Sequence, residues 1–182
     1  WAGLSLGGAS SAVTFNLAGA NTLTLPNNAT FNTTIGTGVV SNPGGATADV
    51  TIGGATGTVT FTSAGAVTMT ARVAQLGAST TSGALSFTDT TALTVIGAVA
   101  STNNAILLSS VGFTLNAGIT INSGSSTIGI NAGAGAVNLN TGTLSSTNAG
   151  AAVTIQNAST VALGNISAAA GTVALGVGGN IS

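Results

Sequence analysis

A large apolar residue, a threonine and a second large apolar residue follow one another nine times in this 182-residue chain. Side chains alternate between the two faces of a strand, so each triplet places both apolar residues on one face and a small β-former on the other. The triplets begin at Val13, Leu23, Val50, Val59, Val67, Leu93, Phe113, Ile119 and Val153. The pattern predicts an all-β fold built from many short strands.

The apolar pairs return at a spacing of about 20 residues. Leu93 and Val95 correspond to Phe113 and Leu115, Val153 and Ile155 correspond to Val173 and Leu175, and Leu108 corresponds to Ile128. This period, with two or three short strands inside it, predicts a parallel β-helix (β-solenoid) with coils of about 20 residues. Each coil would pair its backbone with the coils above and below it, and the inward side chains would form a continuous apolar column.

The chain is expected to form a single β-solenoid domain over residues 1–182, less regular in residues 1–49. Pro43–Gly45 and residues 71–75 interrupt the pattern and are interpreted as loops that leave the coil. The text of Val161–Ser167 returns in two pieces, which begin at Val173 and Gly179, and this strengthens the repeat. Asparagine side chains are expected to form hydrogen-bonded ladders along the rod, at Asn116, Asn138, Asn157 and Asn165.

The composition excludes several classes of function. The chain has one Arg, no Lys, two Asp, no Glu, no His and no Cys, with a formal net charge of −1. It offers no basic patch to nucleic acid, and thiolate or imidazole metal sites cannot form. Mean hydropathy is +0.62, but polar residues interrupt every apolar run well before the ~20 residues of a membrane-spanning helix. No membrane insertion is therefore expected. So little charge suits a molecule that associates with its own copies, and we interpret the composition as extracellular.

Few residues could carry catalysis. Asp49 and Asp89 could in principle form the carboxylate pair of a polysaccharide-cleaving β-helix, but such enzymes need more charged groups than this chain has. Both aspartates are therefore expected to be solvated turn residues, Asp89 within an Asx-turn. Arg72 is interpreted as a solvated surface residue, with pairing to an aspartate or a neighbouring subunit as the alternative. We expect no enzyme activity and no catalytic, cofactor-binding or metal-binding residues.

Two other structural readings are open. Thr-x-Thr units such as Thr58–Thr62 could form the outward threonine ladders of an ice-binding solenoid, although they do not recur once per coil. A pilus-type β-sandwich could instead polymerise by donating its N-terminal strand, with Val13–Phe15 as the donor. Antiparallel strands in two facing layers would distinguish that sandwich from a solenoid.

Several segments resemble the repeats of filamentous haemagglutinin-like bacterial surface proteins. The segments are Ala64–Thr70, Phe87–Val95, Asn116–Asn122 and Val161–Ser167. The resemblance lies in the pattern of residue types within the repeats and covers most of residues 50–182. It implies a right-handed parallel β-helix that is exported across the cell envelope and acts in adhesion, fibres or biofilm. It implies no catalytic residues within the repeats.

The expected function is that of a structural extracellular protein, either a segment of an adhesin stalk or a subunit of a self-assembling surface filament. The expected partners are copies of the chain itself, stacked end to end or associated laterally, and host or neighbouring-cell surfaces. Neither terminus resembles a polar cap, since one begins with Trp1 and the other stops within a repeat at Ser182. Unpaired strand edges at such ends would stack on the next copy.

Overall fold

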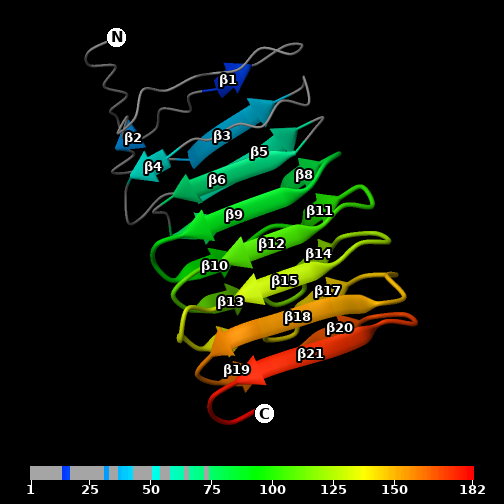
Figure 1. Ribbon diagram of the computed structural model, residues 1–182. Helices are drawn as coiled ribbons and strands as arrows, with labels where there is room; N and C mark the ends of the chain where they lie inside the picture. Colours follow the sequence, from blue (N-terminus) through cyan, green and yellow to red (C-terminus); the bar gives the residue numbers. More distant parts are fainter. Residues whose placement is uncertain are drawn as a thin grey trace.

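The computed structural model describes residues 14–16, 31–32, 37–42, 51–53, 58–63, 66–71 and 74–182. Within these ranges every regular element is a β-strand, and every pair of neighbouring strands is parallel. Within residues 74–182 about five coils of ~21 residues stack into a β-solenoid, which confirms the predicted fold class and coil length. The coils follow one another along the rod in sequence order, with the C-terminus at one end (Figure 1).

One wall of the rod is an eight-stranded sheet to which each coil contributes one strand. Its strands are β2 (Phe31–Asn32), β4 (Thr51–Gly53), β6 (Val67–Ala71), β9 (Leu85–Asp89), β12 (Ile106–Ser109), β15 (Ile128–Asn131), β18 (Ala151–Ala158) and β21 (Thr172–Val177). In Figure 1 these strands lie side by side across the front of the rod.

The other wall is a thirteen-stranded sheet. It begins with β1 (Thr14–Asn16), β3 (Thr37–Asn42) and β5 (Thr58–Ser63). Beyond β5 it divides into two ladders. The first ladder consists of β7 (Gln75–Leu76), β10 (Leu93–Val95), β13 (Phe113–Leu115), β16 (Val137–Asn138) and β19 (Val161–Ala162). The second consists of β8 (Ser79–Thr81), β11 (Val99–Ser101), β14 (Thr120–Asn122), β17 (Thr143–Ser145) and β20 (Asn165–Ser167).

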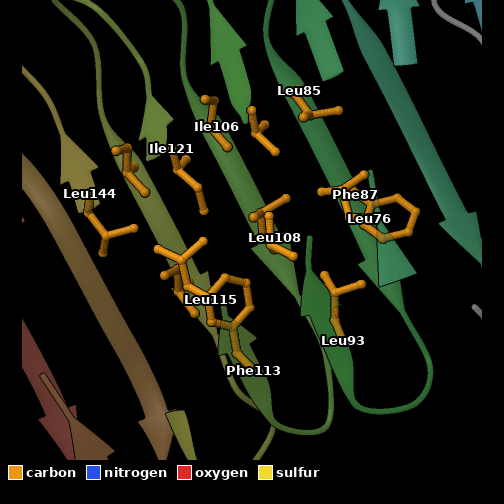
Figure 2. Packing of buried hydrophobic residues seen from close by; sticks show 14 of the residues in the cluster. Leu76, Leu85, Phe87, Leu93, Ile106, Leu108, Phe113, Leu115, Ile121 and Leu144 are labelled. Carbon is orange, nitrogen blue, oxygen red and sulfur yellow. The ribbon is translucent and has the colours of Figure 1, made fainter. Parts of the chain in front are cut away.

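Of the six threonine triplets that the structure describes in full, five behave as predicted, and in the sixth Ile119 is only half-buried while Ile121 is buried. In the five triplets that begin at Val59, Val67, Leu93, Phe113 and Val153, both apolar side chains are buried and the threonine between them is not. The buried residues stack from coil to coil between the two sheets and form one apolar core (Figure 2). Phe61 and Phe87 meet edge to face, with ring centroids 5.5 Å apart, an arrangement favoured by the aromatic quadrupole.

The coil register confirms two of the predicted correspondences and corrects the third. Leu93 pairs with Phe113 and Val153 with Val173, as expected. Leu108 does not pair with Ile128; its partner is Ile130, while Ile128 pairs with Ile106. The coil is two residues longer here than the expected period, and a shift of two leaves the same face inward, so the pattern of apolar residues could not reveal it.

The repeated text near the C-terminus is not a structural repeat. Val161 and Ala162 form β19 in the first ladder, whereas Val173 and Ala174 lie in β21 of the eight-stranded sheet. The same short sequence therefore occurs in two different walls of the rod. The sequence Val-Ala-Leu suits both places because a short inward-outward-inward strand is needed in each.

The irregular stretches fall differently from expectation. Ala71 ends β6 and Gln75 begins β7, so residues 71–75 are not wholly a loop outside the coil. Pro43–Gly45 lies outside the described residues. Within residues 1–49, β1 and β3 already belong to the thirteen-stranded sheet and β2 to the eight-stranded one, so the described strands from β1 to β21 share the same two walls.

A single buried hydroxyl group, that of Ser79, lies at the point where the thirteen-stranded sheet divides. On one side of β5, Thr58 and Val59 pair with β7, and Thr62 and Ser63 pair with β8. Phe61 lies between these paired segments, and its N–H donates to the Ser79 Oγ at 3.0 Å. The same hydroxyl donates to the carbonyl of Gly77 at 3.0 Å. Ser79 is buried, so it satisfies a backbone donor that would otherwise be costly at this branch point.

A tight turn between β15 and β16 connects the eight-stranded sheet to the first ladder. Gly133 and Ala134 both have positive φ, at 50° and 69°, and the Gly135 N–H closes their turn on the carbonyl of Ala132 at 2.7 Å. A Cβ on Gly135 would lie only 2.4 Å from the backbone nitrogen of Gly112 in the coil before. Glycine is therefore required at Gly135 by close backbone contact between turns.

Asparagine side chains join neighbouring coils, but mostly not as ladders of asparagines. Asn157 Nδ2 donates to Asn131 Oδ1 at 3.1 Å, the one bond between asparagine side chains of different coils within the described residues. Asn165 Nδ2 instead donates to a backbone carbonyl 24 residues earlier. The Asn138 side chain accepts the N–H of Asn140 and so closes its own turn. The predicted ladders are thus mainly side chain to backbone bridges.

Candidate functional site

Asp89 is the only charged residue among those the structure describes. It ends β9 at a corner of the coil and is 2% exposed, so the prediction of a solvated aspartate is wrong. The predicted Asx-turn is confirmed, because the Thr91 N–H donates to Asp89 Oδ1 at 2.8 Å. The Thr91 hydroxyl donates to the same oxygen at 2.9 Å. Asp49 and Arg72 lie outside the described residues, so their placement stays a prediction.

The residues at the same position as Asp89 in the neighbouring coils, which form a column along the rod, explain its burial. Coil register places Asp89 beside Ala71 in β6, and the pairing of Thr88 with Ser109 brings it into line with Ser110 of the next coil. Ser110 is also buried, and its hydroxyl donates to the carbonyl of Gly112 at 2.8 Å. This column therefore carries polar groups that bind the turn following the strand. Asp89 holds its own turn, which is a structural use of a carboxylate.

A second buried polar column was not predicted from the sequence. It follows the second ladder and consists of Thr81, Ser101, Ser123 and Ser146. The hydroxyls of Thr81 and Ser101 both donate to the carbonyl of Gly83, at 2.8 and 2.9 Å. Those of Ser123 and Ser146 share another carbonyl in the same way. The available signal was a hydroxyl residue after each short strand at a spacing of about one coil.

The solvent-facing sides of the described coils carry small uncharged residues. On the thirteen-stranded sheet, Thr94 pairs with Thr114 and Thr120 pairs with Thr143. Neither pair extends into a longer ladder, because Asn138 follows Thr114 in its column and Asn165 follows Thr143. The long outward threonine ladder that an ice-binding surface needs is therefore not formed on this sheet within the described residues.

The last coil of the described residues carries aliphatic side chains that are exposed, whereas the preceding coil buries the residues in the same columns. We define the C-terminal layer as β20, β21 and residues 180–182. Val173 in β21 is 41% exposed and Ile181 is 50% exposed, whereas Val153 and Val161, one coil earlier in the same columns, are 0% and 1% exposed. Leu163, at the corner between β19 and β20, is 40% exposed. Of the five large hydrophobic residues that are exposed in the described part of the chain, Val173 and Ile181 lie in this layer and Leu163 lies next to it.

Residues 180–182 form a partial step at this end. The Val161 N–H donates to the carbonyl of Asn180 at 3.0 Å, and the Leu163 N–H donates to that of Ser182 at 2.7 Å. These bonds add one more layer to the first ladder beyond β19. The second ladder ends one layer earlier, at β20, which pairs with β17. Residues 180–182 therefore lie one layer beyond β20 along the rod.

The described residues offer few groups that could form a chemical site. No group of three His, Cys, Asp or Glu side chains that could hold a metal ion lies among residues 14–16, 31–32, 37–42, 51–53, 58–63, 66–71 and 74–182. No helix long and apolar enough to cross a membrane is found in the same ranges. Comparison with known proteins finds no family model, no curated protein and no solved structure that matches the chain.

Proposed function

We propose that this chain is a structural protein of the cell exterior, a β-solenoid rod that serves as a segment of an adhesin stalk or of a self-assembling surface filament. The observation that carries the proposal is the pairing of a continuous solenoid core with a described surface that has no exposed charge. Asp89, the one charged side chain described, is buried within a turn. In such a molecule the side chains serve mainly to hold stacked coils together and not to form a reactive site.

The physical argument concerns solubility and self-association. Net charge keeps proteins apart in solution, and a surface without charge removes this repulsion between copies. Asn, Ser and Thr side chains on the outside still bind water through hydrogen bonds. A rod of this kind is suited to a setting where association is useful, such as a surface layer or fibre. Copies of the chain are the first proposed partner, and host or neighbouring-cell surfaces are the second.

The resemblance to filamentous haemagglutinin-like repeats supports the same function. The proposed parallel β-helical stalk agrees with the parallel coils of the described residues. The pilus alternative has lost its support, because it requires antiparallel strands in two facing sheets. Thr14–Asn16, at the expected donor strand, forms β1 and pairs in parallel with β3 of its own chain. A polysaccharide-cleaving activity is not proposed, since Asp89 binds its own turn.

Localisation tests the proposal directly. Antibodies raised against the purified chain should label intact cells of the source, viewed by immunogold electron microscopy, without permeabilisation. Antibodies against a cytosolic protein of the same cells serve as the control and should label only permeabilised cells. Beads coated with the chain should also adhere to source or host cells more than beads coated with a globular protein. Label that is confined to the cell interior would refute the proposed function.

A further inference from the structure

The outward side of the eight-stranded sheet is one unbroken face along the rod (Figure 1). The thirteen-stranded wall, in contrast, divides into two ladders beyond β5. From β6 to β18 the outward residues of the eight-stranded sheet stand in two columns, and the second column carries only Thr, Ser, Asn and Gln. We call this surface the lateral face. Its first column consists of Thr68, Ser86, Leu107, Gly129, Thr154 and Ala174.

Leu107 is the one large apolar residue of the first column, and it is 41% exposed. Its neighbours in the column are Ser86 and Gly129. A Cβ added at Gly129 would lie 3.0 Å from Leu107 Cδ1, so Leu107 leans towards the position that has no side chain. Because β12 is paired with β9 on one side and β15 on the other, only a molecule or segment at the side of the rod can cover Leu107.

The chemistry of the lateral face favours a flat, uncharged partner. The face carries no charged side chain, so it offers no ion pair to a charged protein or polymer. The aromatic rings of Phe61, Phe87 and Phe113 are all buried, so these rings give a sugar no surface to stack on. What the face does offer is close approach of small side chains around one exposed aliphatic group. The lateral face of a second copy has these same properties.

We infer that two copies of this chain pack sheet on sheet through their lateral faces, about a twofold axis that runs parallel to the strands and passes between β12 and β15. This inference rests on the proposed structural function and names the partner and the face that it uses. Rotation about this axis reverses the direction of one rod and places β12 of one copy over β15 of the other. Leu107 of each copy then lies over Gly129 of its partner, an isologous contact in which a large side chain meets a position without one.

The size of the contact predicts a weak dimer. The same axis places β9 over β18 and β6 over β21, so six strands of each copy overlap. With ~4.8 Å between strands and ~3.3 Å per residue, six strands of about five residues cover ~29 by ~16 Å, or about 460 Å² per copy. The total of about 900 Å² lies below the ~1,200–2,000 Å² of stable complexes and in the range of weak, reversible ones.

Sedimentation equilibrium of the 182-residue chain over a range of concentrations tests the inference. We expect a weak monomer–dimer equilibrium. Leu107→Asp should weaken the dimer at least ~100-fold, because it buries an unpaired carboxylate between the sheets. Val111→Asp is the matched control and should leave the dimer unchanged, since Val111 is 55% exposed but lies at the corner after β12, outside the lateral face. Circular dichroism should show that both variants keep the strand content of the parent.

Gly129→Thr is a second variant that does not add charge. It introduces a good strand residue but fills the position that receives Leu107 of the partner, so it should weaken the dimer at least ~5-fold. A monomer at all concentrations would overturn the inference. Association that survives both Leu107→Asp and Gly129→Thr, whether into dimers or filaments, would show that copies meet elsewhere and would overturn it as well.

Cross-linking with a short bismaleimide tests the direction of packing, because the chain has no cysteine of its own. The proposed axis places Ser86 of one copy opposite Thr154 of the other, so a mixture of Ser86→Cys and Thr154→Cys variants should give cross-linked heterodimers. Ser86→Cys alone should not cross-link, since its two copies would lie three strand spacings, ~14 Å, apart along the rod. Cross-linking of Ser86→Cys alone would indicate rods packed in the same direction and would refute the proposed axis. Surface labelling of cells does not depend on these outcomes, so the proposed function is tested separately.

Discussion

Replacement of Ser79 tests whether one hydroxyl group permits the thirteen-stranded sheet to divide. Ser79→Ala removes the acceptor of the Phe61 N–H, which is bound at 3.0 Å in a buried site. A buried donor left without a partner costs about 1–3 kcal/mol. For a chain of 150–250 residues each kcal/mol corresponds to about 2–4 °C in Tm. Ser79→Ala is therefore expected to lower Tm by about 2–12 °C.

The assay combines thermal unfolding, followed by circular dichroism, with amide hydrogen exchange. The Phe61 amide should lose protection in Ser79→Ala, because its hydrogen bond is the one removed. Ser79→Thr is the matched variant, since it keeps the Oγ and should retain most of the stability and the protection of Phe61. Ser86→Ala, on the outward face of β9, controls for the loss of a strand serine and should change Tm little.

Two results would refute this reasoning. If Ser79→Ala keeps both the Tm and the protection of the Phe61 amide, the Ser79 hydroxyl does not stabilise the branch point. If Ser79→Thr loses as much stability as Ser79→Ala, the site is sensitive to side-chain shape and not to the acceptor.

Three further tests, with five substitutions in all, probe the turns and a control position by urea unfolding. Ala134→Gly should stabilise the chain by about 0.5–1 kcal/mol. Glycine removes the ~1–2 kcal/mol cost of alanine in a left-handed conformation, but its more flexible unfolded state offsets ~0.4–1 kcal/mol of this gain. A loss of stability would contradict the positive φ of 69°. Gly135→Ala should destabilise it by about 1–3 kcal/mol, since its Cβ would lie 2.4 Å from Gly112, whereas Gly176→Ala meets nothing closer than 3.5 Å and should be nearly neutral; equal effects would reject the close contact. Asp89→Ala should cost more than Asp89→Asn, by about 1 kcal/mol, because asparagine keeps the Oδ1 that accepts two bonds; equal losses would mean that the turn bonds contribute little.

Much of the fold could be predicted because alternation along a strand is a local property. The alternation of apolar and polar residues in a triplet such as Val59–Phe61 predicts which side chains face inward, whatever the rest of the molecule does. The recurrence of such triplets at a near-constant spacing then implies stacked coils, since a short strand cannot bury its apolar face alone. Strand pairing of Leu93 with Phe113 followed directly from this spacing.

The candidate site was less accessible to sequence reasoning. Asp89 was expected in solvent because charged residues are rarely buried, and only its place in a column between Ala71 and Ser110 shows why it is not. The correspondence of Leu108 with Ile128 failed for a related reason. Coil length varies at the turns, and a change of two residues preserves the inward face while it moves every partner.

The sequence by itself determined the class of structure: short strands of two inward residues around a small outward one, repeated about once every 20 residues. Only the tertiary structure decided which copies of the pattern share a wall, where one ladder becomes two, and that Asp89 is buried. The physical reason is that side-chain alternation is set by neighbours along the chain, whereas register, branching at Ser79 and burial of Asp89 depend on contacts between coils about 20 residues apart.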